Sequence, residues 1–144
     1  MPLTEPERRF LEARRRVVLV TLAPDGRPRP IPICFTLGDD EAVLYTPLDD
    51  KPKATDDPLA LARVRDISAD PRVSVLADRW DEDWTRLAWL RAEGRAGLLE
   101  PGPEHAAAVT ALRARYPQYA THRLDARPLI RIEIGRVTTW GPLD

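Results

Sequence analysis

The sequence is poor in residue types that several classes of protein require. It contains one cysteine, Cys34, which excludes an internal disulfide and a cysteine-based zinc site. The two histidines, His105 and His122, fall in no Ser/His/Asp or Cys/His pattern, so we assign no catalytic side chain and no metal ligand. No glycine-rich phosphate loop of the dinucleotide-binding or P-loop type occurs. Nucleophilic, zinc and P-loop chemistry therefore have no support in the sequence.

Charge and hydropathy exclude further classes. The net charge of −1 lacks the basic excess of a general nucleic-acid binder. The longest near-apolar run, residues 17–23, is too short to cross a bilayer, and the charged N-terminus has no apolar signal-peptide core. We therefore expect a cytoplasmic protein that binds neither nucleic acid nor membrane. The 144 residues suit a single domain over 1–144 with a sizeable hydrophobic core.

Capping, turn and periodicity signals predict the order helix, three strands, helix, two strands, helix, strand. The first helix begins at a capping box formed by Thr4 and Glu7 and reaches about Arg15. The second begins at Asp57-Pro58, with the aspartate as its cap. Strands are expected over residues 17–23, 26–37, 42–46, 72–78, 86–99 and 129–140, and the third helix follows Pro103. Six strands without regular helix alternation predict a mainly β fold, an antiparallel sheet curled into a barrel with about three flanking helices.

Three prolines alternate along the second strand, in the stretch GRPRPIPICF of residues 26–35. The N–H groups of residues i and i+2 point to the same edge, so Pro28, Pro30 and Pro32 remove donors from one edge only. The other edge stays able to pair with the first strand, and pairing with the third strand can resume only from about Cys34. The open seam either protects against unwanted strand addition or forms a slot for a flat ligand.

Two lysines follow the third strand, in the stretch LYTPLDDKPK of residues 44–53. We expect Lys51 and Lys53 to project to one side of an extended segment, with the hydroxyls of Thr46 and Thr55 nearby. The N-terminus of the next helix adds free N–H groups, so the loop is suited to a phosphate. The alternative is an exposed polar loop whose lysines pair with neighbouring aspartates.

Four stretches taken in order resemble the pyridoxamine 5'-phosphate oxidase-like split β-barrel family, the FMN-binding split barrels. They are DGRPRPIPICF, LYTPLDDKPK, RDISADPRVSVLAD and DEDWTRLAW, and they look closest to the branch that uses the deazaflavin coenzyme F-420. The resemblance implies a homodimer of six-stranded Greek-key split barrels with cofactor sites at the subunit interface. It also implies an F-420-dependent oxidoreductase that transfers a hydride between the cofactor and a small organic acceptor. The alternatives are an FMN-binding oxidoreductase of the same fold and a flavin or deazaflavin carrier or sensor without turnover.

The resemblance also implies positions for the cofactor contacts. The lysine loop matches the phosphate-binding loop, the second strand matches the segment against the ring system, and two tryptophans match aromatics near the cofactor or the neighbouring subunit's site. Asp66 stands where the family often has asparagine, so no contact is expected from it. The arginine set of true pyridoxamine-phosphate oxidases is not evident, and two poorly placed histidines disfavour haem handling. With Thr55 from the loop, the expected cofactor-binding residues are Ile31, Pro32, Ile33, Thr46, Lys51, Lys53, Thr55, Trp84 and Trp140.

Overall fold

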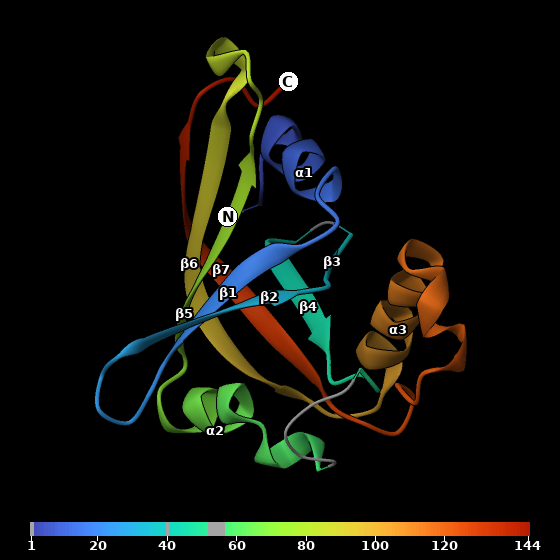
Figure 1. Ribbon diagram of the computed structural model, residues 1–144. Helices are drawn as coiled ribbons and strands as arrows, with labels where there is room; N and C mark the ends of the chain where they lie inside the picture. The colour runs from blue at the N-terminus through green and yellow to red at the C-terminus, as the bar shows by residue number, and fades with distance from the viewer. Residues whose placement is uncertain (1, 40, 52–56) are drawn as a thin grey trace.

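The computed structural model describes residues 2–39, 41–51 and 57–144 (Figure 1). All seven strands form one antiparallel sheet in the order β2-β1-β5-β6-β7-β4-β3, which curls as a split barrel does and confirms the predicted fold class. The elements are α1 (Glu5–Glu12), β1 (Val17–Leu22), β2 (Pro28–Ile33), β3 (Thr36–Leu37), β4 (Val43–Pro47), η1 (Pro58–Ala60), α2 (Ala62–Ala69), β5 (Arg72–Arg79), η2 (Trp84–Arg86), β6 (Ala88–Leu99), α3 (Pro103–Arg115), η3 (Pro117–Thr121) and β7 (Leu129–Trp140).

The sheet has seven strands rather than the expected six because the second predicted strand is divided. β2 ends at Ile33 and β3 begins at Thr36, so the intervening Cys34 and Phe35 connect the two edge strands of the sheet. Phe35 is fully buried, and its N–H donates to the Tyr116 hydroxyl at 3.1 Å. The two edge strands β2 and β3 are therefore consecutive in the chain but do not pair with each other. The segment between them bonds the Tyr116 side chain instead of a strand, and the barrel is split at this point.

The proline geometry agrees with the prediction from the sequence. β2 pairs with β1 over its whole length, and the Ala23 N–H donates to the Arg27 carbonyl at 2.9 Å beside the hairpin turn. Hydrogen-bonded pairs alternate along an antiparallel ladder, so residues 29, 31 and 33 donate to β1 and the prolines face the outer edge. Pairing with β4 resumes at Thr36, opposite Tyr45. Among the described residues, the proline edge has no strand partner.

The core fills the inner side of the curled sheet, and the helices cover it. One buried cluster joins α1 and α2 to β1, β5, β6 and β7, and a second joins α3 and η3 to β4. Figure 1 shows α1 and α2 towards opposite ends of the barrel, with α3 beside β4. The predicted apolar stripes of the second and third helices are buried as expected, at residues 61, 64 and 67 and at residues 109, 112 and 116. No helix in the described ranges is long and apolar enough to cross a membrane.

Two predicted helix boundaries are wrong. α1 ends at Glu12 rather than near residue 15, and the Arg14 guanidinium then donates to the Phe10 carbonyl at 3.2 Å, which satisfies an acceptor of the last turn. Asp57 caps the short turn η1, where its carboxylate accepts the Leu59 N–H at 3.0 Å, and α2 itself begins only at Ala62. The second helix is therefore shorter than expected.

The capping box at α1 is confirmed and supplies a stability test. The Thr4 hydroxyl accepts the Glu7 N–H at 3.2 Å, and the Glu7 carboxylate accepts the Thr4 N–H at 2.9 Å. Thr4→Ala is expected to lower the free energy of unfolding by about 1 kcal/mol in urea denaturation. Thr110→Ala is the control, because that hydroxyl only back-bonds to the Ala106 carbonyl within α3. Equal losses in the two variants would show that the cap contributes nothing specific.

Candidate functional site

The lysine loop leaves the sheet at the end of β4 and folds against η3. Leu48 is buried, and the next residue, Asp49, is an acid with only 7% of its surface exposed. The Tyr119 hydroxyl donates to the Asp49 carboxylate at 2.6 Å, and the Lys51 ammonium pairs with the same carboxylate. The chain therefore places a buried acid, a lysine and a tyrosine hydroxyl in one cluster.

The cluster extends to the segment between β2 and β3. The Lys51 ammonium lies 3.2 Å from the Tyr119 hydroxyl and 3.9 Å from the Cys34 sulfur. Burial, reinforced by the hydrogen bond to Asp49, raises the pKa of Tyr119 well above its usual range. The phenol therefore stays protonated at neutral pH and acts as a donor. The end of the proline strand and the lysine loop meet at this point.

Arg63 adds a second cation that no sequence motif singled out. It lies in α2, the helix that follows the lysine loop, and its Nε–H is buried with no hydrogen-bond partner in the described part of the chain. Desolvation lowers the pKa of Arg63, while the nearby Asp49 and Tyr119 act in the opposite direction. Arginine remains charged in proteins, so a buried, unsatisfied donor lies within electrostatic range of Asp49, the ion-pair partner of Lys51. In the sequence, the position of Arg63 shortly after the K-x-K stretch of residues 51–53 could have indicated it as a further phosphate-binding cation.

These residues fit the phosphate of a cofactor. A buried N–H without a partner costs free energy comparable to a lost hydrogen bond, and an anion's oxygen would satisfy it. Among the described side chains of this cluster, Lys51 and Arg63 are cationic and Asp49 is anionic. Arginine and lysine are the side chains that bind phosphate, the first through a planar fork and the second as a point charge. The donor set is therefore suited to an oxyanion rather than to a metal.

Two arginines that follow η3, Arg123 and Arg127, also hold the lysine loop. Asp50 accepts hydrogen bonds from Arg123 at 2.7 Å and pairs with Arg127 at 2.8 Å, and Arg127 also donates to the Leu48 carbonyl at 3.1 Å. Hydrogen bonds from Arg123 hold the pKa of Asp50 well below its usual range. The alternative from the sequence, lysines paired with neighbouring aspartates, describes Lys51 and Asp49, but Asp50 is bound by arginines.

The remaining residues of the predicted phosphate and ring contacts differ in accessibility. Ile31 and Pro32 are exposed on β2, whereas Ile33 turns into the core. Thr46 is buried within β4 at 1% exposure, opposite Ile130 of β7. Lys53 and Thr55 lie outside the described residues. The contacts expected from these side chains therefore stay predictions.

The two predicted tryptophans are far from the lysine loop within one chain. Trp84 in η2 is 68% exposed, and Trp140 at the end of β7 is 53% exposed. Figure 1 shows η2 and the end of β7 at one end of the long strands, and α2 with the lysine loop at the other. One copy of the chain therefore does not bring all the predicted cofactor contacts together.

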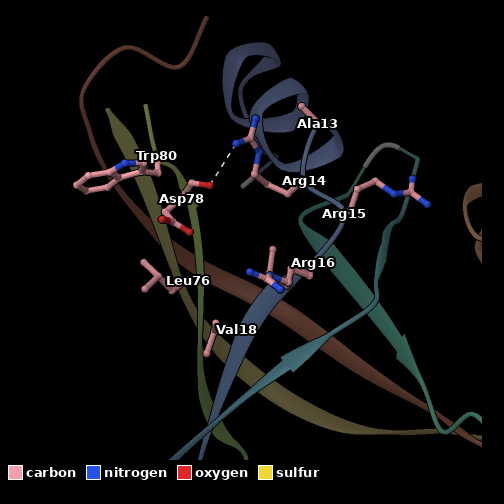
Figure 2. A pocket seen from close by; sticks show the side chains of 9 residues that line it. Ala13, Arg14, Arg15, Arg16, Val18, Leu76, Asp78 and Trp80 are labelled. Atoms are coloured by element: carbon pink, nitrogen blue, oxygen red, sulfur yellow. Dashed lines mark hydrogen bonds between the residues drawn. The ribbon is translucent and has the colours of Figure 1, made fainter. Parts of the chain in front are cut away.

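A surface hollow of about 630 Å³ lies on the outer side of β1 and β5. Figure 2 shows Arg16, Leu76 and Trp80 around it, while Arg15 is turned away towards α3. Arg14 closes one side, where its guanidinium donates to the Asp78 carbonyl at 3.2 Å. The hollow thus exposes apolar and cationic side chains beside β5, the strand that precedes η2 and Trp84.

Asp66 bonds side chains of the same protein chain, which explains why an acid is tolerated at this buried position of α2. It is 2% exposed in α2, where it accepts the Thr21 hydroxyl at 2.8 Å and pairs with the Arg29 Nε at 3.1 Å. A buried carboxylate requires such partners. In the described ranges, no group of three or more His, Cys, Asp or Glu side chains is placed to hold a metal ion.

Comparison with known proteins identifies relatives of the whole chain. Residues 3–141 match the family profile described as pyridoxamine 5'-phosphate oxidase. No curated protein matches the sequence. A conserved hypothetical protein from Mycobacterium tuberculosis superposes with a TM-score of 0.76 at 21% identity, over 96% of this chain and 85% of that one.

Two further solved structures resemble the chain. A FAD-binding protein from Mesorhizobium loti has a TM-score of 0.65 at 24% identity, over 96% of this chain and 93% of its own. A protein described as an F-420 reductase has a TM-score of 0.67 at 22% identity, over 94% of this chain and 98% of its own. At these identities the structural likeness establishes the fold and leaves the ligand open.

Proposed function

Because the chain belongs to the pyridoxamine 5'-phosphate oxidase family, we propose that it is an oxidoreductase that uses coenzyme F-420 and a small organic acceptor. The observation that carries the proposal is the unsatisfied Arg63 Nε–H, which belongs to a guanidinium that interacts electrostatically with Asp49, the ion-pair partner of Lys51. The Lys51 ammonium in turn lies 3.9 Å from the sulfur of Cys34, which follows the strand with the unpaired edge. The fold shared with an F-420 reductase supports the choice of cofactor. When bound, the deazaflavin supplies the hydride chemistry, and the protein binds and orients it.

The phosphate end of the cofactor is assigned to the lysine loop. Lys51 and Arg63 supply charge, and Tyr119 holds Lys51 in place through the shared contact with Asp49. Lys53 is expected to contribute a second ammonium group. The ion pair with Asp49 keeps the Lys51 ammonium oriented, and the Arg63 Nε–H has no hydrogen-bond partner in the described residues.

The ring end is assigned to the open edge of β2. Ile31 and Pro32 present exposed apolar surface on the two faces of the strand. The prolines have no N–H on the outer edge, so Cys34 carries the first N–H group on that edge after Pro32. A backbone amide at this point can donate to the ring system and stabilise negative charge that develops there on reduction. No side chain of this chain is assigned as acid or base.

We further propose that the cofactor lies between two copies of the chain. Trp84 and Trp140 contact the same ligand as Lys51 only if a second copy supplies them, because they lie at the other end of the barrel. The exposed side chains of Leu76, Trp80 and Trp140 supply apolar surface for such an interface. The homodimer thus accounts for both groups of expected contacts.

Mixed dimers test this arrangement. Lys51→Ala and Trp84→Ala are each expected to weaken F-420 binding as homodimers. A heterodimer that carries Lys51→Ala in one subunit and Trp84→Ala in the other should recover one strong site. One of its two sites then has both wild-type residues, and the other has both substitutions. Fluorescence titration of tagged, co-purified heterodimers measures the recovery. Weak binding at both sites would contradict a shared interface.

Turnover is tested with reduced F-420 and a panel of quinones and enones, followed at the absorbance of the oxidised cofactor. The proposal predicts acceptor-dependent oxidation that requires the protein and is lost in Lys51→Ala. Binding without oxidation of the reduced cofactor by any acceptor would indicate a carrier. A yellow protein with a flavin spectrum, purified from a host that lacks F-420, would indicate an FMN enzyme.

A further inference from the structure

One contact of the lysine loop depends on the protonation of a histidine. The backbone N–H of Asp50 donates to His122 Nδ1 at 3.1 Å. A backbone N–H can only donate, so Nδ1 must be free of a proton and the imidazole neutral when this bond exists. The bond fixes the backbone of the residue that directly precedes Lys51.

The same histidine also contacts the cluster around Asp49. The His122 ring packs edge-on against the Tyr119 ring, with 5.2 Å between the ring centroids. The Tyr119 hydroxyl in turn bonds both Asp49 and Lys51. The His122 carbonyl accepts the Arg113 guanidinium at 3.0 Å, which anchors the backbone of His122 to α3. The charged or titratable groups around His122 are Asp49, Asp50 and Lys51 of the loop, Arg113 of α3, Tyr119 of η3, and Arg123, Asp125 and Arg127 beyond it.

We propose that His122 is a positioning residue for the lysine loop, and that its protonation releases the Asp50 amide and weakens cofactor binding. A proton on Nδ1 would face the Asp50 N–H, so the ring must rotate and the hydrogen bond is lost. The arginine contacts to Asp50 persist, so the loop loosens rather than detaches. We call the hydrogen bond between the Asp50 N–H and His122 Nδ1 the latch. The effect on cofactor affinity rests on the proposed function, whereas the loss of the latch on protonation does not.

Asp50 and Tyr119 keep their charge states in the relevant pH range. Arg123 and Arg127 hold the pKa of the Asp50 carboxyl well below its usual range, and burial keeps Tyr119 protonated. Histidine is the side chain that ordinarily changes charge between about pH 5 and pH 8. The other histidine, His105, is buried in α3, with its Nε2 2.6 Å from the Arg127 carbonyl, and it requires a separate control.

The first experiment measures F-420 affinity by fluorescence at about pH 7.5 and about pH 5.5. Wild type is expected to bind roughly three- to tenfold more weakly at the lower pH, the effect of one lost hydrogen bond. His122→Asn keeps an acceptor that does not titrate, so it should bind well at both pH values. His122→Leu should bind weakly at both, and His105→Gln should keep the wild-type profile. Because F-420 carries an ionisable ring hydroxyl and FMN an ionisable phosphate, the pH effect is read as the difference between wild type and each variant measured with the same ligand.

The proposal is overturned if His122→Asn retains the wild-type pH profile, or if His122→Leu binds as tightly as wild type at the higher pH. A wild-type pH profile that disappears in His105→Gln would instead assign the effect to the buried histidine. Each of these results separates positioning by His122 from a merely structural role of the ring.

The second experiment needs no cofactor. The ¹⁵N–¹H resonance of Asp50 is followed in the wild-type protein as the pH is lowered, together with the ring signals of His122. The latch predicts that both titrate together and that the amide signal becomes flat in His122→Asn. A ring that titrates without a response of the Asp50 amide would contradict it. If F-420 and FMN both fail to bind while the two signals titrate together, the proposed function fails and the latch stands.

Discussion

Arg63→Ala is expected to weaken F-420 binding by about 10- to 100-fold and to leave the fold intact. The Arg63 Nε–H is buried without a partner in the described residues, so the loss of the side chain removes no internal hydrogen bond made by that atom. A bound phosphate would instead lose a charge-assisted hydrogen bond and one of its cationic partners. Calorimetric titration of the variant measures the change in affinity, and urea denaturation checks the fold.

Arg65→Ala is the matched control for this prediction. Arg65 lies two residues further along α2 and is exposed, so its removal changes the net charge by the same amount. Its effect on F-420 binding should stay below about threefold, as for an ordinary surface charge. Equal losses in the two variants would remove Arg63 from the site and reduce the effect to general electrostatic attraction.

Gly94→Ala is expected to destabilise the protein by at least about 3 kcal/mol. Gly94 lies at the β-bulge between β6 and β7, where a Cβ atom would stand 2.2 Å from the Glu133 carbonyl oxygen. Because the obstacle is backbone, the two long strands must separate or the bulge must shift. These strands carry much of the core, so a local shift there disturbs the whole sheet.

Gly97→Ala provides the comparison within the same strand. A Cβ atom at residue 97 would meet nothing within 4 Å, so this substitution should cost less than about 1 kcal/mol. Guanidinium denaturation of the three proteins measures both values. If Gly94→Ala were as stable as Gly97→Ala, the close approach of the strands at the bulge would be wrong.

The local geometry of the proline strand could be predicted from the sequence because it depends on chain periodicity alone. Alternation fixed which edge lost its donors, and the hairpin at Asp25-Gly26 fixed the partner of the other edge. The break at Cys34 and Phe35 could not be predicted in the same way. It depends on the Tyr116 hydroxyl, which belongs to a residue 81 positions away in the sequence.

The candidate site was predicted less completely for the same physical reason. Lys51 was predicted through its spacing to Lys53, a local signal. The burial of Asp49 and the unsatisfied Arg63 depend on how η3 and α2 pack against the loop, and no local pattern encodes that packing. Asp66 showed as a departure from the family, and only its contacts with Thr21 and Arg29 gave it a structural role.

A paired equilibrium titration of the purified protein with F-420 and with FMN, under one set of conditions, tests the proposed cofactor most directly. We expect saturable binding of one F-420 per chain, tighter than that of FMN, through a site that contains Lys51 and Arg63. Saturable binding of FMN alone would contradict the choice of cofactor. The absence of saturable binding for both would contradict a phosphate-bearing cofactor at the lysine loop altogether.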